Sequence, residues 1–210
     1  VGKDADARAL FISSEGRGWC AGGDVKELDQ HPERIVTVNA GNYETFKAVH
    51  LCPIPVIVAL HGYVLGGGIG ITGAADIVVA SECTTFALPE VDRGAMGGGA
   101  HLQRLFPVQK VRYLFFTGET ISVQDADKYG FIERIVPKEK LRENALDIAA
   151  KIAAKSSDMI RIAKESLNGI EDGDLEAKYR WEQGFTLQAY TSPDSAETRR
   201  AFVEKRDATF

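Results

Sequence analysis

Three consecutive glycines interrupt an otherwise apolar part of the chain, in the sequence HGYVLGGGIGIT at 61–72. They follow VIVAL at 56–60, a β-branched run typical of a buried strand. Glycine loses more backbone entropy on folding than any other residue, so such a run indicates positive φ or close approach of another group to the main chain. The chain is therefore expected to turn sharply after a strand and to present bare backbone there.

A second glycine-rich turn, WCAGGDVKEL at 19–28, has the same character. Asp24 is placed to cap the helix predicted after it, which leaves the Gly23 N–H pointing outward, as the Gly67 N–H does at another helix start. Free amides at helix starts bind anions, and two of them from distant turns make an oxyanion hole. Turns with no chemical role are the alternative, because glycine is common in turns.

The letters GIGITG at 68–73 also match the dinucleotide-binding pattern GxGxxG. This match is weak, because the run lies between the second and third predicted strands rather than after the first. A phosphate-binding P-loop is excluded, since the lysine and the Ser/Thr that it needs are missing.

Strand-like and helix-like segments alternate up to residue 137, which favours an α/β fold with a parallel or mixed sheet covered by helices. After that residue the apolar positions follow a helical period with little strand signal. We predict a core over 1–137 that carries the site, and a helical region over 138–210 for packing and oligomerisation. The predicted strands are RALFISS, VIVAL, DIVVAS, TTFALPE and IERIVP.

Composition excludes several classes of function. A net charge of −5 over 210 residues argues against a nucleic-acid binder that relies on a basic face. The longest apolar run, around 54–60, is too short to cross a bilayer, so no membrane partner is expected. The three cysteines, Cys20, Cys52 and Cys83, are widely spaced and form no CxxC pair. They predict no metal site and favour a reducing compartment, hence a cytoplasmic protein.

Four motifs in order resemble the crotonase superfamily, the enoyl-CoA hydratases and isomerases. They are GRGWCAGGDVKEL, PVIVALHGYVLGGGIGITGAADIVVAS, FALPEVDRGAMGG and AFVEKRDATF, and the similarity runs through essentially the whole chain. The resemblance implies a crotonase-like spiral of ββα units with a C-terminal helical region used to form a homotrimer or a dimer of trimers. It also implies an acyl-CoA substrate whose thioester oxygen becomes an enolate, with no cofactor beyond the coenzyme A moiety of that substrate.

The resemblance assigns the chemistry residue by residue. The two oxyanion donors fall on the backbone amides of Gly23 and Gly67, and the acid–base carboxylate falls on Glu90. Hydratases of the family carry two glutamates, but Gly70 stands at the position of the first. Concerted addition of water is therefore in doubt, whereas one carboxylate suffices to move a proton between two carbons or to activate one water. Without the resemblance, Glu90 would be interpreted as an exposed carboxylate at a strand end.

The remaining candidates are residues that would bind the substrate and one residue that would act as a second acid. Asp92 and Arg93 are the next candidates, Asp92 as a second acid. For both, the alternative is pairing with each other or contact with solvent. For the lysines among the coenzyme A candidates, an ordinary solvated helix face is the alternative. For His101, helix packing is the alternative. The coenzyme A candidates are Ala21, Asp24, Lys26, Phe202 and Lys205, the last two often contributed by a neighbouring subunit, and the acyl-pocket candidates are Trp19, Met96 and His101.

Two other functions stay open beside the hydratase or isomerase reaction. PEVDRGAMGGGAHLQRLFP and YRWEQGFT resemble actinobacterial members that open a ring of a steroid-derived β-keto acyl-CoA by hydrolysis. A non-catalytic, crotonase-like binding subunit is the third possibility, since fold does not fix function. The family normally begins with a β-hairpin and a helix ahead of residue 1, so we expect the natural chain to start earlier.

Overall fold

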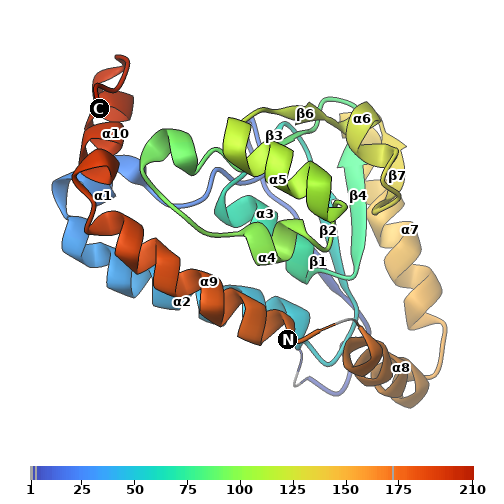
Figure 1. The fold of residues 1–210 in the computed structure, drawn as a ribbon. Helices are drawn as coiled ribbons and strands as arrows, with labels where there is room; N and C mark the ends of the chain where they lie inside the picture. The colour runs from blue at the N-terminus through green and yellow to red at the C-terminus, as the bar shows by residue number, and fades with distance from the viewer. Residues whose placement is uncertain (1, 3, 172) are drawn as a thin grey trace.

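The computed structural model describes residue 2, residues 4–171 and residues 173–210. Four parallel strands form its main sheet, in the order β1-β2-β4-β7 (Figure 1). The central strands are buried on both faces, which explains why VIVAL is apolar at every position rather than at alternate ones. The four strands are β1 (Leu10–Ile12), β2 (Val56–Leu60), β4 (Ile77–Ser81) and β7 (Ile132–Val136).

A smaller sheet lies across the core from the first. Its order is β3-β5-β6, with β3 parallel to β5 and β6 antiparallel. Cys20 extends this sheet through a parallel bridge to Val64. Its strands are β3 (Tyr63–Leu65), β5 (Thr85–Ala87) and β6 (Ile121–Ser122).

The chain repeats one pattern three times: a strand in the main sheet, a strand or bridge in the small sheet, and then helix. This is the spiral of ββα units expected from the sequence. The first unit ends in α1 (Val25–Gln30), a 3-10 turn at Pro32–Arg34 and α2 (Ile35–His50). The second ends in α3 (Gly67–Ala74), and the third in a 3-10 turn at Val91–Arg93, α4 (Gly99–Leu102) and α5 (Val108–Thr117).

The last part of the chain is helical, as predicted. It starts after α6 (Val123–Asp127), β7 and a 3-10 turn at Lys138–Lys140. Within it, α7 packs on the outer face of the main sheet, against Ile57, Ala59 and Val79. Figure 1 shows α9 beside α2, and α10 projecting next to α1. The four helices are α7 (Leu141–Ala153), α8 (Ser157–Ile170), α9 (Leu175–Tyr190) and α10 (Pro193–Glu204).

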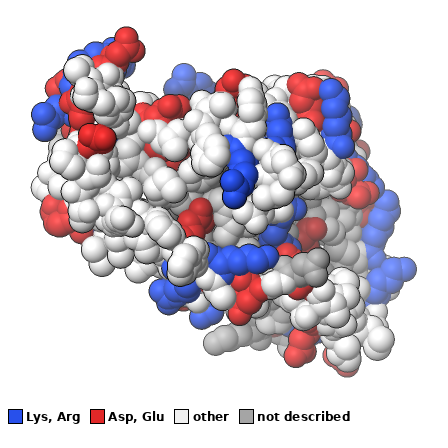
Figure 2. All heavy atoms as spheres, viewed as in Figure 1, with Lys and Arg blue, Asp and Glu red and all other residues white. Residues whose placement is uncertain are grey.

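Sequence analysis missed the shortest elements. The strands β3 and β6 have three and two residues, too few for alternation to show. It also gave no helix over 108–117, where α5 lies. Figure 2 shows acidic and basic side chains interspersed over the visible face. Among the helices of the described residues, none has both the length and the apolar character that crossing a bilayer demands.

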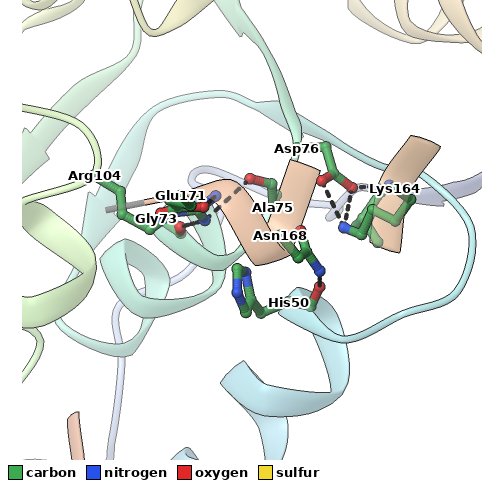
Figure 3. A network of polar contacts seen from close by, with 9 residues as sticks. His50, Gly73, Ala75, Asp76, Arg104, Lys164, Asn168 and Glu171 are labelled. Atoms are coloured by element: carbon green, nitrogen blue, oxygen red, sulfur yellow. Dashed lines mark hydrogen bonds and ion pairs between the residues drawn. The ribbon is translucent and has the colours of Figure 1, made fainter. Parts of the chain in front are cut away.

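Partly buried polar contacts attach α8 to the end of α3 (Figure 3). The Lys164 ammonium lies 2.5 and 2.6 Å from the two carboxylate oxygens of Asp76, and Asp76 also accepts a hydrogen bond from the Val56 N–H. Arg104 pairs with Glu171 and donates to the carbonyls of residues 73 and 75 at the end of α3. These contacts fix the C-terminal end of the helix that begins with the glycine triplet.

Candidate active site

Three turns meet at one edge of the small sheet, because each follows the same point of its ββα unit. The turn at Gly23 follows the Cys20 bridge, the turn at Gly67 follows β3, and the turn at Glu90 follows β5. The three strand segments are parallel neighbours in the order Cys20, β3, β5. Parallel strands end at the same edge, so the fold brings these three turns together.

The glycines at 22 and 66 allow the three turns to pack closely against one another. Both residues have positive φ, of 85° and 51°. A Cβ on Gly22 would lie 2.8 Å from the amide nitrogen of Gly67, and a Cβ on Gly66 would lie 2.8 Å from Oε1 of Glu90. The glycines therefore serve both purposes inferred from the sequence, an unusual backbone conformation and close approach to the main chain.

Gly23 and Gly67 line one cavity together with Glu90. Within the described part of the chain, neither N–H donates a hydrogen bond. Gly67 is the first residue of α3, where the helix leaves its amides without an internal acceptor. Two unpaired donors on one cavity wall can stabilise a negatively charged oxygen.

Glu90 supplies the one carboxyl group among the described residues that line this cavity. Its Oε2 is buried and has no hydrogen-bond partner in the residues described. Burial raises the pKa of this carboxyl to about 8, although the positive charge of Arg93 acts in the opposite direction. The group therefore exchanges a proton near neutral pH, as an acid–base catalyst requires.

The helix α9 contributes Tyr179, Thr186 and Tyr190 to the cavity lining. Thr186 donates a hydrogen bond of 2.8 Å from its hydroxyl to the Met96 carbonyl. The Gln183 amide donates to the backbone and side-chain oxygens of Asn39, at 2.7 and 2.9 Å, which joins α9 to α2. The cavity is thus enclosed by the far end of the same chain, and water has less access to the carboxyl group.

Comparisons with known proteins identify the family of this chain. The family model described as enoyl-CoA hydratase/isomerase matches residues 1–210. The chain belongs to the enoyl-CoA hydratase/isomerase family. It is accordingly an acyl-CoA-processing enzyme with the crotonase fold.

Two relatives and one solved structure illustrate the similarity. A Rhodococcus jostii protein named (7aS)-7a-methyl-1,5-dioxo-2,3,5,6,7,7a-hexahydro-1H-indene-carboxyl-CoA hydrolase is 44% identical, over 97% of this chain and 80% of its own. A Mycobacterium tuberculosis protein of the same name is 43% identical, over 98% of this chain and 84% of its own. The crystal structure of enoyl-CoA hydratase from Bacillus anthracis is 31% identical with a TM-score of 0.77, and the match covers all of this chain and 83% of that one.

The position of the hydratase family's first glutamate has no room for a side chain in this enzyme. A Cβ on Gly70 would lie 2.2 Å from Cζ of the Phe46 ring. The ring, which is 3% exposed, fills the space into which a second carboxylate would project. The absence of that carboxylate is therefore built into the packing of α2 against α3.

Three predicted residues are not placed on the cavity. Trp19 is 7% exposed and packs in the core rather than among the described residues that line the cavity. His101 is buried behind Phe46 and Tyr179, with ring centroids 4.7 and 4.9 Å away, and burial lowers its pKa to about 3. Asp92 is exposed and lies against Gly118. The expectation of Trp19 and His101 as pocket residues is corrected accordingly, while Met96 does line the cavity.

The candidates for coenzyme A contacts lie on adjacent elements at one end of the molecule. Ala21 lines the cavity, and Asp24 caps α1 by accepting hydrogen bonds from the amides of Lys26 and Glu27. Lys26 is exposed on α1, which packs beside α10. Phe202 lies on α10, and Lys205 ends that helix with a positive φ of 56°.

Sequence analysis missed the polar residues that complete the cavity wall. They belong to helices whose periodicity was recognised, but nothing local shows that α2 and α9 would face each other there. Within the described residues, no group of His, Cys, Asp and Glu has the arrangement of a metal site. The missed residues are Asn39, Asn42, Tyr179, Thr186 and Tyr190.

Proposed function

We propose that the enzyme binds the thioester carbonyl of an acyl-CoA between the amides of Gly23 and Gly67 and moves protons with Glu90. The observation that carries this proposal is the shared cavity of two unpaired amides and one unpartnered, buried carboxyl group. Each oxyanion donor is worth about 2.7–4 kcal/mol in a site from which water is excluded. Negative charge that develops on the thioester oxygen is thereby stabilised, and the adjacent carbon becomes easier to protonate or deprotonate.

We further propose that the reaction is the hydrolytic opening of a ring in a cyclic β-keto acyl-CoA. Two relatives named as hydrolases of such a compound are 44% and 43% identical to this chain. The packing of Phe46 at Gly70 supports this reaction over concerted hydration, which uses two carboxylates.

The proposed reaction balances with one water and one carboxyl group. Ionised Glu90 takes a proton from water, and the water oxygen bonds to the ring ketone carbon. The bond between that carbon and the α-carbon of the thioester then breaks, and its electron pair passes into the thioester as an enolate. Glu90 returns its proton to the α-carbon, which leaves a ring-opened carboxylic acid that is still a coenzyme A thioester.

Isomerisation of a double bond in an enoyl-CoA is the second candidate. It needs the same enolate and one proton carrier, so the single carboxyl group of the cavity also supports it. The two reactions are distinguished by substrate rather than by the residues that hold the thioester.

Purified enzyme tests both candidates directly. It is incubated with a 2-enoyl-CoA, a 3-enoyl-CoA and a cyclic β-keto acyl-CoA, and we expect the last to be consumed. The variant Glu90→Gln is expected to lose turnover and to keep binding of the coenzyme A ester, whereas Glu133→Gln, at an exposed carboxyl group on β7, keeps both. An undiminished rate in Glu90→Gln would exclude Glu90 as the proton carrier. Turnover of none of the three thioesters would favour a non-catalytic binding subunit.

The coenzyme A moiety is proposed to lie along α1 and α10. Ala21 and Asp24 border its entry, Lys26 and Lys205 supply positive charge for its phosphates, and Phe202 offers an apolar surface. A chain of net charge −5 must concentrate cations locally to hold such a polyanion. No further cofactor is needed for the chemistry proposed.

We also propose that the enzyme forms a homotrimer or a dimer of trimers in the cytoplasm. Apolar side chains of α8 are exposed, Met159 to 62% and Ile170 to 72%, and Trp181 of α9 is 75% exposed. Figure 2 shows few charged side chains over much of α9. Exposed apolar surface of this kind marks protein–protein interfaces. The three cysteines are unpaired, in keeping with a reducing compartment.

A further inference from the structure

The proposed reaction develops negative charge on two oxygens, and the two amides serve only one of them. The thioester oxygen becomes the enolate that faces Gly23 and Gly67. The ring ketone oxygen becomes an alkoxide when water attacks, and then part of a carboxylic acid when the carbon–carbon bond breaks. This acid ionises to a carboxylate by releasing its remaining O–H proton to water. A cavity that hydrolyses a β-keto thioester therefore needs a second positive group, which a double-bond isomerase does not.

Arg93 is a cation that lines the cavity, and none of the ion pairs between described residues includes it. It lies three residues after Glu90 in the same 3-10 turn, where its amide donates to the Glu90 carbonyl at 3.0 Å. Its positive charge acts on the Glu90 carboxyl group. Arg93 is therefore close to the atoms among which water and the proton must move.

The guanidinium group of Arg93 is held by an aromatic ring instead of by a carboxylate. Its central carbon lies 4.8 Å from the centroid of the Phe202 ring on α10. Stacking of this kind holds a guanidinium plane and leaves its N–H groups free to donate at the edge. The nearby Arg199, in contrast, is 4% exposed and donates to the Gly94 carbonyl and the Ser195 hydroxyl, which join α10 to the turn.

We infer that Arg93 binds the second oxyanion, the alkoxide and then the carboxylate formed at the β-carbon of a β-keto acyl-CoA. This inference rests on the proposed function and narrows it to substrates with an oxygen at that carbon. The planar guanidinium fork matches a carboxylate with two parallel hydrogen bonds. Phe202 is then a positioning residue for Arg93, in addition to the role in coenzyme A binding proposed above.

The experiment compares Arg93→Gln and Arg93→Lys with Arg112→Gln, at an exposed arginine on α5, as the matched control. Two activities are measured: opening of a cyclic β-keto acyl-CoA, and exchange of the α-proton of a saturated acyl-CoA in deuterium oxide. The second needs the thioester enolate but no second oxyanion. We expect Arg93→Gln to lower ring opening about 10- to 100-fold more than it lowers exchange, the range for loss of one charge-assisted hydrogen bond. Arg93→Lys is expected to recover part of the loss, and Arg112→Gln to lose nothing.

Inhibition by product gives an independent readout. The ring-opened acid is expected to inhibit the wild-type enzyme about tenfold more strongly than its uncharged amide, and Arg93→Gln is expected to abolish this preference. Equal losses of ring opening and exchange in Arg93→Gln, or no loss of either, would overturn the inference. Absence of both activities from the wild-type enzyme would instead overturn the proposed function.

Discussion

Replacing Glu90 by glutamine is expected to stabilise the fold while it removes activity. Burial holds the pKa of the carboxyl group at about 8 in the native state, against 4.5 for an ordinary glutamate. At pH 7 the native carboxyl group keeps its proton, whereas the unfolded chain releases it. The interval from 4.5 to 7, at 1.36 kcal/mol per pH unit, corresponds to about 3 kcal/mol of lost stability. Glutamine has no proton to release, so the variant does not lose this stability.

The sign of the pH dependence follows from proton binding in the two states. Between pH 4.5 and about 8 the native state binds one more proton at Glu90 than the unfolded state, so the free energy of unfolding falls as pH rises. Below 4.5 both states are protonated, and the full stability is present. The advantage of Glu90→Gln should therefore grow by about 1.4 kcal/mol per pH unit between pH 5 and 8.

Urea unfolding of the two proteins at pH 5, 6, 7 and 8 measures this difference. Subtracting the wild-type free energy of unfolding from that of Glu90→Gln at each pH cancels the contributions of the titratable groups that both proteins share. The charges that act on Glu90 from neighbouring elements are those of Arg93 and Glu182, and both proteins contain them. A difference that stayed constant from pH 5 to 8 would refute the reasoning, because a solvated carboxyl group titrates alike in both states.

Four further results are expected. The value of kcat/KM for the wild-type enzyme should rise with pH up to about 8, as Glu90 ionises, and a flat profile from pH 6 to 9 would contradict its role as the base. Gly66→Ala should lower kcat at least about tenfold, because its Cβ would displace the carboxylate oxygen that lies 2.8 Å away; unchanged kcat would disprove that contact. Gly70→Glu should melt several degrees below wild type, because the added atoms overlap the Phe46 ring, and it should gain no hydratase activity. The control Gly41→Glu, in open space on α2, should melt within about 2 °C of wild type. Ile170→Lys should yield smaller species in sedimentation velocity than the wild-type protein, and an unchanged distribution would remove α8 from the proposed interface.

The turns that carry Gly23, Gly67 and Glu90 were predictable because their sequence signals are local. Each of Gly23, Gly67 and Glu90 follows a short extended segment, and glycine at 22 and 66 reports both positive φ and close approach. The family's motifs then gave the three positions their roles. The spiral that brings them together is a repeated local pattern, so strand and helix periodicity carried much of the fold.

The opposite wall of the cavity was not predictable in the same way. Asn39 and Gln183 are 144 residues apart, and their hydrogen bonds depend on how α9 docks against α2. Helical periodicity shows which side of a helix is apolar but does not name the surface that it meets. The side chains of Trp19 and His101 lie near the predicted turns in sequence, yet both point into the core, since backbone direction at a turn decides what a large residue faces.

Because α9 covers the cavity, the cavity is completed late in the folding of the chain. The sheet, the two amides and Glu90 are all synthesised before the residues that cover them, because α9 lies near the end of the chain. A nascent chain can thus assemble its reactive groups while they still face bulk water, where the carboxyl group ionises freely and an enolate gains little. A chain in which α9 is not yet docked on α2 would hold the same turns without the cover that α9 gives them.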